Sequence, residues 1–190
     1  MLPFTATALL VIDAQESFRQ RPYWSHADAQ GYFDRQQALI DGALARKLPV
    51  IQILHVRDGD ELFSPASGHV RTLQELSIVP TVTFQKYRHS AFVGTGLDVW
   101  LTQHGIRRLI VSGIRTEQCC ETTARHASDV GYEVDFVTEA TLTFPMQSAD
   151  GRTFSPSDIK TRTELVLTER FARIVSVEDA LADATARQAA

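Results

Sequence analysis

The sequence predicts an α/β fold in which a mostly parallel sheet lies between two layers of helices. Short, continuous apolar runs recur along the chain, which is typical of strands covered on both faces. Helical patterns lie between most of these runs and indicate βαβ units with right-handed crossovers. The length of 190 residues suits about one domain. We therefore expect residues 1–190 to form a single three-layer α/β/α, Rossmann-like domain with six strands in the order 3-2-1-4-5-6.

Six apolar runs are the expected strands. They cover residues 8–12, 50–55, 81–85, 108–112, 133–137 and 173–177. Two connections are unusually long, at 57–80 and 141–154. Long connections in a compact domain often shape a binding site or a lid, so we expect both to border the site. A disordered insertion is the alternative for each.

Helices are expected where apolar residues recur at helical spacing. They cover residues 33–46, 97–104, 116–130, 156 to about 171, and the Ala-rich end at 180–190. Gly105 and Gly131 end the second and third of these helices. Ser155, Pro156 and Asp158 form an N-terminal capping pattern for the fourth. The Ala-rich end is expected to close a helix and then fray.

Composition and charge exclude several classes of function. The chain has 44% hydrophobic and 22% charged residues, as globular proteins do. A net charge of −4 argues against nucleic-acid and anionic membrane partners. Residues 1–12 lack Lys and Arg, and their apolar run ends at Asp13, so neither a signal peptide nor a membrane span is expected. The adjacent Cys119 and Cys120 cannot link distant segments, and this usage fits a reducing cytosol, so we expect a cytoplasmic protein.

Three reactive side chains follow different predicted strands. Asp13 follows the first strand, Lys86 follows the third, and Cys119 lies a few residues after the fourth, in the first turn of the next helix. Parallel sheets gather ligands at the carboxyl ends of their strands, so these three groups should meet at one edge. A carboxylate, an ammonium and a thiol together form a plausible nucleophilic site.

These groups suit one another chemically. The helix N-terminus and Lys86 are expected to lower the pKa of the Cys119 thiol. Asp13 alone would raise that pKa, but its carboxylate can take the thiol proton during attack. Backbone N–H groups at the start of the helix can bind an oxyanion. Cys120, one residue further, turns about 100° away and is interpreted as a bystander.

Three segments carry a resemblance to a known family. They are 9–18 (LLVIDAQESF), 86–92 (KYRHSAF) and 112–124 (SGIRTEQCCETTA). In this order, each after its strand, they resemble the isochorismatase-like cysteine hydrolase superfamily over residues 6–177. The resemblance implies a catalytic triad of Asp13, Lys86 and Cys119, and a non-proline cis peptide before Arg115. It also implies an oxyanion hole made by the backbone N–H groups of Arg115 and Cys119.

The resemblance further implies a reaction and an assembly. Cys119 would form a thioester while the C–N bond of a small amide, carbamoyl or ureido compound is cleaved. Relatives are commonly dimers or tetramers, so a homo-oligomer is expected. Residues 54–60 (LHVRDGD) do not match the Asp-x-His metal pattern of nicotinamidase relatives, so we expect no metal and no cofactor, and nicotinamide is disfavoured as substrate. Glu139-Ala140 stands where the superfamily usually has Asp-Ala.

Several side chains are candidates to contact the substrate. They are Gln15, Phe18, Trp24, His55, Arg57, Phe92 and Phe144. Trp24, Phe92 and Phe144 could equally pack at a subunit interface, and Arg57 could bind a substrate carboxylate or remain solvated or salt-bridged.

Two alternatives to the amidohydrolase stay open. One is an isochorismatase-type hydrolase of a C–O bond in a vinyl ether, although dedicated isochorismatases often lack the cysteine. The other is a catalytically silent α/β binding module, against which the triad argues. The sequence does not identify the substrate.

Overall fold

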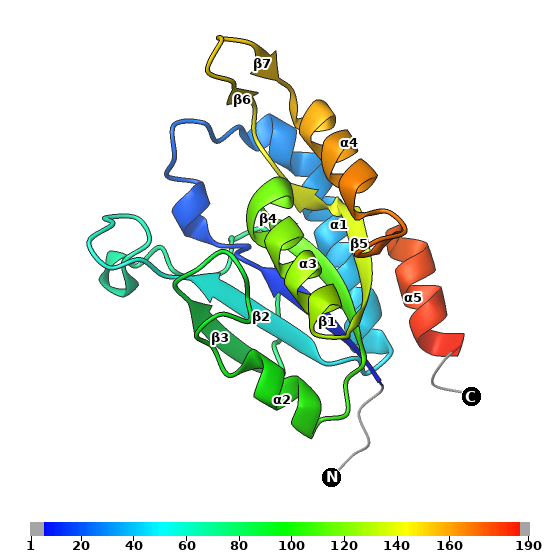
Figure 1. Cartoon of the computed structure of the whole chain (residues 1–190). Coiled ribbons are helices and arrows are strands. Elements are labelled where there is room, and N and C mark those ends of the chain that lie inside the picture. Colours follow the sequence, from blue (N-terminus) through cyan, green and yellow to red (C-terminus); the bar gives the residue numbers. More distant parts are fainter. Residues whose placement is uncertain (1–5, 187–190) are drawn as a thin grey trace.

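The predicted α/β fold with a six-stranded parallel sheet is confirmed by a computed structural model (Figure 1), which describes residues 6–186 without the side chains of residues 27, 28, 185 and 186. The strands of the sheet are β1 (Thr7–Ile12), β2 (Val50–His55), β3 (Val82–Lys86), β4 (Arg108–Ile114), β5 (Glu133–Leu142) and β8 (Arg173–Ile174). All neighbouring strands pair in parallel, in the order β3-β2-β1-β4-β5-β8. The predicted order 3-2-1-4-5-6 is therefore confirmed, with β8 as its sixth strand.

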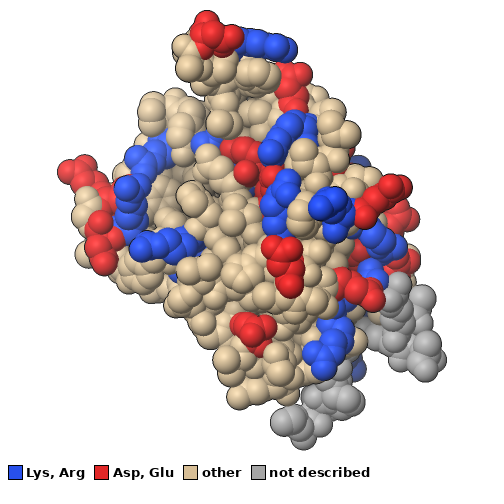
Figure 2. All heavy atoms as spheres, viewed as in Figure 1, with Lys and Arg blue, Asp and Glu red and all other residues tan. Residues whose placement is uncertain are grey.

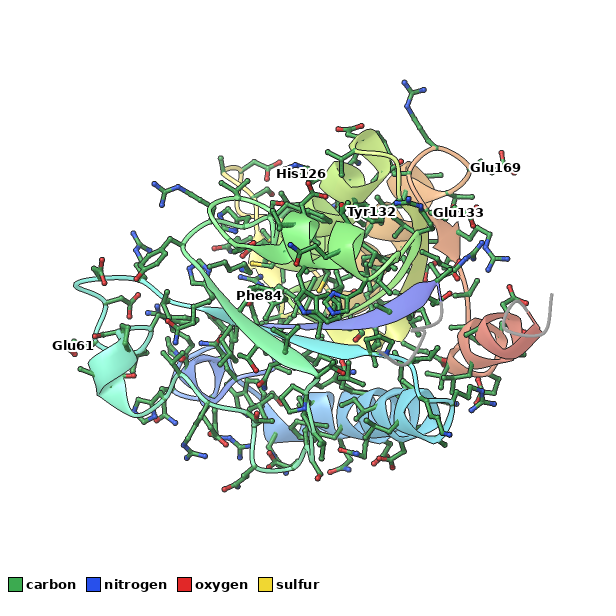
Figure 3. All side chains as sticks on the ribbon, turned by 90° about the horizontal axis from the view of Figure 1, so that it is seen from below. Glu61, Phe84, His126, Tyr132, Glu133 and Glu169 are labelled. Atoms are coloured by element: carbon green, nitrogen blue, oxygen red, sulfur yellow. The ribbon has the colours of Figure 1, made fainter. Side chains whose placement is uncertain are left out.

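Helices cover both faces of the sheet. They are α1 (His26–Ala45), α2 (Leu97–Gln103), α3 (Glu121–Asp129), α4 (Pro156–Leu167) and α5 (Val177–Ala186). Residues of α1 and α5 pack in one apolar cluster, and residues of α2, α3 and α4 pack in the other. Figure 3 views the sheet close to edge-on, with α1 on one side and α3 on the other. No described helix is long and apolar enough to cross a membrane.

The central strand β1 explains why its sequence is continuously apolar. From Ala8 to Ile12 every residue has no solvent-exposed surface. Leu9 and Val11 pack on the α1 side, whereas Ala8, Leu10 and Ile12 pack on the α2 and α3 side. Alternate side chains of a strand point to opposite faces, so a strand with two covered faces needs apolar residues throughout.

Two predicted helices have different limits in the structure. The first begins at His26 rather than residue 33, since Ala29 and Tyr32 also pack in the core. The fourth has the predicted capping box, in which Ser155 Oγ accepts from the Asp158 N–H at 3.1 Å. It ends at Leu167 rather than near residue 171, because Thr168 leaves the helical conformation. The last predicted helix is α5, and its predicted fraying at 187–190 lies outside the described residues.

The predicted helix over 116–130 is divided. Its first turn is a π-helical turn, η3 (Thr116–Cys120), and α3 follows it directly. The Cys120 N–H donates to the Arg115 carbonyl oxygen at 3.2 Å, five residues back. Single π turns inside helices are often found at functional sites, and this one carries Cys119.

Both long connections form hydrogen-bonded structure. The connection after β2 contains the short helix η2 (Pro65–Ser67) and returns to the segment behind β1, where the Glu16 N–H donates to the Arg71 carbonyl at 2.9 Å. Glu61 marks its outer side in Figure 3. The connection after β5 forms a hairpin of β6 (Met146–Gln147) and β7 (Thr153–Phe154), which was not predicted and projects at one end of the molecule (Figure 1).

Candidate active site

Asp13 is the residue that directly follows β1, and its backbone conformation fixes the direction of its side chain. Its φ of 51° is left-handed, which Asp tolerates better than most residues with a Cβ. Its N–H donates to the Ile53 carbonyl at 2.8 Å, and its own carbonyl accepts from the Gln15 N–H at 2.8 Å. Asp13 has no exposed surface. The carboxylate is therefore a buried charge, and it needs a partner of opposite sign.

Lys86, the last residue of β3, provides that partner. Its Nζ lies 2.7 Å from Asp13 Oδ2, 3.2 Å from Cys119 Sγ and 3.2 Å from His55 Nδ1. The side chain has no exposed surface. Burial acts to lower the pKa of Lys86, but the negative charges and hydrogen bonds of Asp13 and Cys119 outweigh it and raise the pKa overall. Lys86 therefore stays protonated at neutral pH. Asp13, Lys86 and Cys119 meet at one edge of the sheet, as the sequence predicted.

Cys119 lies in η3 and is 6% exposed. The sequence led us to expect a lowered pKa for this thiol, and that expectation was wrong. Burial is the largest effect and raises the pKa of Cys119, Asp13 raises it further, and Lys86 lowers it by less. The thiol is therefore protonated at neutral pH, so a nucleophilic attack by Cys119 needs a base that removes the proton.

The Asp13 carboxylate has one oxygen available for that proton. Oδ2 accepts from Lys86, whereas Oδ1 is buried and has no hydrogen-bond partner among the described residues. A carboxylate oxygen of Asp13 and the Cys119 sulfur lie within 4.8 Å of each other. Buried polar atoms nearly always have partners, so Oδ1 is an unusual acceptor that is free to take a hydrogen bond.

Possible ligand atoms at this site have the spacing of a metal site. Ligand atoms of Asp13, His55 and Cys119 all lie within 4.8 Å of one another, and this donor set is one that zinc accepts. Lys86 Nζ, however, is in hydrogen-bond contact with all three residues. A divalent ion on these ligands would meet the ammonium charge at contact distance. The residues therefore do not fit a resident metal ion while Lys86 is protonated.

A cavity of about 350 Å³ opens onto this group. Its lining residues are Asp13, Phe18, Arg21, Pro22, Tyr23, His55, Arg57, Asp60, Phe63, His89, Arg115, Gln118 and Cys119. Figure 2 shows the molecule hollowed on this side, with Lys and Arg side chains gathered along part of the rim. A larger cavity of about 630 Å³ lies between α4 and the β6–β7 hairpin, but none of the three reactive residues lines it. The smaller cavity is therefore the candidate active site.

A family model, the isochorismatase domain, matches residues 7–179. The chain belongs to the isochorismatase family. YrdC of Bacillus subtilis (strain 168), described as an uncharacterized member of this family, is 22% identical over 178 residues, which cover 93% of this chain and 95% of YrdC. Nicotinamidase 3 of Arabidopsis thaliana is 45% identical over 65 residues, which cover 34% of this chain and 33% of that protein.

Solved structures of similar proteins share the fold over nearly the whole chain. A candidate isochorismatase from Burkholderia xenovorans LB400 has a TM-score of 0.87 at 28% identity, covering 97% of this chain and 89% of that one. A cysteine hydrolase from Pseudomonas syringae pv. phaseolicola 1448A has a TM-score of 0.87 at 21% identity, covering 98% of this chain and 97% of that one. Isochorismatase-family proteins are hydrolases of small molecules, and the cavity volume suits such a ligand.

The cis peptide that the family resemblance implied is present between Ile114 and Arg115. The Arg115 guanidinium forms an ion pair with Glu117, since its Nε lies 3.1 Å from Glu117 Oε1. It also lies over the rings of Tyr23 and Phe144, at 5.4 Å and 5.5 Å. Arg115 therefore borders the cavity with its charge already paired.

Three of the predicted substrate-contacting residues line the cavity, namely Phe18, His55 and Arg57. Arg57 has no acidic partner within ion-pair distance among the described residues, unlike Arg21, which pairs with Asp60 at 2.8 Å. Arg57 is therefore the arginine of the cavity whose charge is open to a ligand.

The other four predicted contacts are placed elsewhere. The Gln15 amide bonds the backbone of His55, accepting from its N–H at 2.8 Å and donating to its carbonyl at 3.0 Å. Trp24 and Phe144 pack together with ring centroids 5.7 Å apart. Phe92 packs against other aromatic rings on the α2 and α3 side. None of these four is among the lining residues of the cavity.

Sequence reasoning missed His89, whose Nδ1 lies 3.7 Å from Cys119 Sγ. Its position three residues after Lys86, in the second family segment, was the available signal. It also missed Phe63 and the pair of Arg21 and Asp60. These residues come from two loops that meet only after folding, so no local sequence pattern predicts that they line the cavity.

Proposed function

We propose that this chain forms one catalytic domain, a metal-independent cysteine hydrolase that cleaves the C–N bond of a small amide, carbamoyl or ureido compound. One observation carries the proposal: the buried Lys86 ammonium is hydrogen-bonded to both Asp13 and Cys119 beside a cavity of small-molecule size. A neutral thiol, a fixed carboxylate with a free oxygen and a buried cation together are the parts needed for base-assisted attack on a carbonyl.

Acylation begins with the proton of Cys119. Asp13 Oδ1 takes this proton as the sulfur attacks the carbonyl carbon, and the carbonyl π electrons move to the oxygen. Lys86 holds Asp13 Oδ2 and stays charged, so that the carboxylate keeps its position. The tetrahedral intermediate collapses when its C–N bond breaks, and Asp13 returns the proton to the leaving nitrogen. The products of this half-reaction are ammonia or an amine and an acylated Cys119, which is a thioester for an amide substrate and a thiocarbamate for a carbamoyl or ureido substrate.

Deacylation repeats the sequence with water. Asp13 accepts a proton from a water molecule while the oxygen of that water attacks the carbonyl carbon bound to Cys119. The C–S bond breaks, and the proton returns from Asp13 to the Cys119 sulfur. An amide substrate leaves as a carboxylic acid, a carbamoyl or ureido substrate leaves as a carbamic acid, and the protein is restored. One carboxylate therefore serves as base and then as acid in both half-reactions.

The oxyanion of each tetrahedral intermediate needs hydrogen-bond donors. We assign the backbone N–H groups of Arg115, the residue between β4 and η3, and of Cys119 in η3. Each such donor contributes about 3–4 kcal/mol of transition-state stabilisation in well-studied enzymes. The Arg115 guanidinium is paired with Glu117, so we assign only the backbone N–H of Arg115 to the reaction.

Similarity to nicotinamidases supports the choice of an amide. Besides the Arabidopsis protein, the nicotinamidase of Escherichia coli (strain K12) is 38% identical over 56 residues, which cover 30% of this chain and 26% of that protein. The alternative is the cleavage of a C–O bond in a vinyl ether, which the family name itself suggests. The position of the Cys119 thiol beside Lys86 and Asp13 favours an amide substrate, since vinyl ether hydrolysis needs no nucleophilic sulfur.

The test is ammonia release from a panel of small primary amides, N-carbamoyl compounds and ureas, with isochorismate included for the alternative. Cys119→Ala is expected to lose turnover, and the matched control Cys120→Ala is expected to keep it, because Cys120 is fully buried and does not line the cavity. Iodoacetamide at pH 6–8 is expected to label Cys119 before Cys120. Equal labelling of both cysteines, together with a fully active Cys119→Ala, would overturn the proposal.

A further inference from the structure

His55 contacts the reactive group without belonging to the triad. It is the last residue of β2, and its Nδ1 lies 3.2 Å from Lys86 Nζ. The Gln15 amide holds its backbone on both sides. The Phe63 ring meets the imidazole edge-on, with centroids 5.7 Å apart and an interplanar angle of 77°. The imidazole is therefore held in one orientation, half-buried on the cavity wall.

Counting hydrogens fixes the protonation of this ring. A lysine ammonium has three N–H donors and no acceptor. Asp13 Oδ2 takes one hydrogen and Cys119 Sγ takes another, so the contact with His55 Nδ1 uses the third. Nδ1 can accept only if it carries no hydrogen. In the neutral ring the hydrogen then resides on Nε2, which has no hydrogen-bond partner among the described residues.

We propose that His55 is the positioning residue of Lys86 and a hydrogen-bond donor to the substrate. Its Nδ1 completes the set of three acceptors around the ammonium, which ties Nζ between the base and the nucleophile. Its Nε2–H then faces the cavity, where it donates to an acceptor group of the bound substrate. This inference rests on the proposed function for its catalytic part, whereas the ring's protonation is independent of any activity.

The charges around His55 favour this arrangement. Lys86, Arg57 and His89 disfavour a positive ring, and Asp13 alone favours one. Burial is the largest effect, and together these groups lower the pKa of His55 from 6.5 to about 4. The ring is therefore neutral from pH 5 to pH 8. It can accept from Lys86 and donate to a ligand across that range.

Nitrogen-15 NMR of the wild-type protein tests the ring directly. We expect His55 to show a hydrogen on Nε2 and none on Nδ1 from pH 5 to pH 8, with titration only near pH 4. A hydrogen on Nδ1, or titration near pH 6.5, would overturn the inference. Neither result depends on whether Cys119 is a nucleophile, so this measurement can fail while the proposed function stands.

Kinetics of matched variants test the catalytic part on the best amide of the panel. In His55→Asn the side-chain oxygen can replace Nδ1 as acceptor, whereas the amide nitrogen takes the place of the ring carbon Cδ2 and is one bond too short to replace the Nε2–H donor. In His55→Leu both are lost. We expect His55→Leu to lower kcat on the order of 10- to 100-fold, the usual effect of losing a hydrogen bond to a charged group. We expect His55→Asn to keep kcat within about threefold and to raise KM about 10-fold.

Equal kcat values in the two variants would refute the positioning role, provided that urea unfolding shows both folded. An unchanged KM in His55→Asn would refute the donor role. Cys119→Ala separates the two levels of the argument. If it is inactive while both His55 variants match the wild type, only this inference fails. If it is fully active, the proposed function fails.

Discussion

Replacing Lys86 by Met is expected to destabilise the protein more than the loss of almost any surface charge. The Lys86–Asp13 pair has no exposed surface on either side chain, and its N–O distance is 2.7 Å. Removing one partner of a buried ion pair leaves the other charge uncompensated, which costs about 3–5 kcal/mol. With a urea m-value of about 2 kcal/mol/M, the unfolding midpoint should fall by about 1.5–2.5 M.

Urea unfolding of four proteins measures the effect. They are the wild type, Lys86→Met, Asp13→Asn and the double variant. Asn is chosen because it also tolerates the left-handed φ of 51° at this position. The double variant leaves no unpaired charge, so its cost should be less than the sum of the single costs by at least about 3 kcal/mol. A loss below about 1 kcal/mol in Lys86→Met, the range of exposed pairs, would refute the description of this pair as buried.

Three further predictions follow from the site and its surroundings. Asp13→Asn should lower amide turnover at least about 10³-fold, because burial keeps the Cys119 thiol protonated and the variant lacks the base that takes its proton. Turnover within about 10-fold of the wild type would show that Asp13 is not the base. Gly113→Ala should cost at least about 3 kcal/mol in urea unfolding, since φ is 123° and an added Cβ would lie 1.9 Å from the carbonyl oxygen that ends β1. Gly94→Ala is the control, since its φ is 72° and an added Cβ there would have no atom within 4 Å. An equal loss of stability in both variants would show that the close contact at Gly113 contributes nothing. Arg57→Gln should raise KM about 10-fold for amides that carry a carboxylate, with neutral amides unaffected, and an equal change for both would show that Arg57 binds no anion.

The sequence was sufficient for the central strands β1, β2, β4 and β5, because burial on both faces requires apolar residues along most of each strand. Thr7–Ile12 illustrates this, as each of its residues is almost fully buried. The placement of Asp13, Lys86 and Cys119 followed from the same rule, since parallel strands end at one edge. The division of the helix at 116–130 did not follow, because apolar spacing does not distinguish a π turn from an α turn. That turn depends on the Arg115 carbonyl oxygen, which accepts from the Cys120 N–H five residues on.

The sign of the Cys119 pKa shift also lay beyond the sequence. Lys86 and a helix start were visible in the chain, but the depth of the thiol was not, and burial is the larger effect. The cavity wall shows the same limit. Phe63 reaches the site only because its loop folds back over η1 (Glu16–Phe18), where its ring meets Phe18 with centroids 5.1 Å apart. Contacts between distant loops depend on the closed fold.

Trapping of the acyl group tests the central claim most directly. The protein is mixed with the amide that releases most ammonia in the panel, quenched with acid during turnover, digested and weighed by peptide mass spectrometry. The account predicts that the peptide containing residues 119 and 120 gains the mass of the acyl group, that fragmentation places it on Cys119, and that Cys119→Ala shows no adduct. Turnover without any adduct on a cysteine, or an adduct on Cys120, would contradict the covalent mechanism.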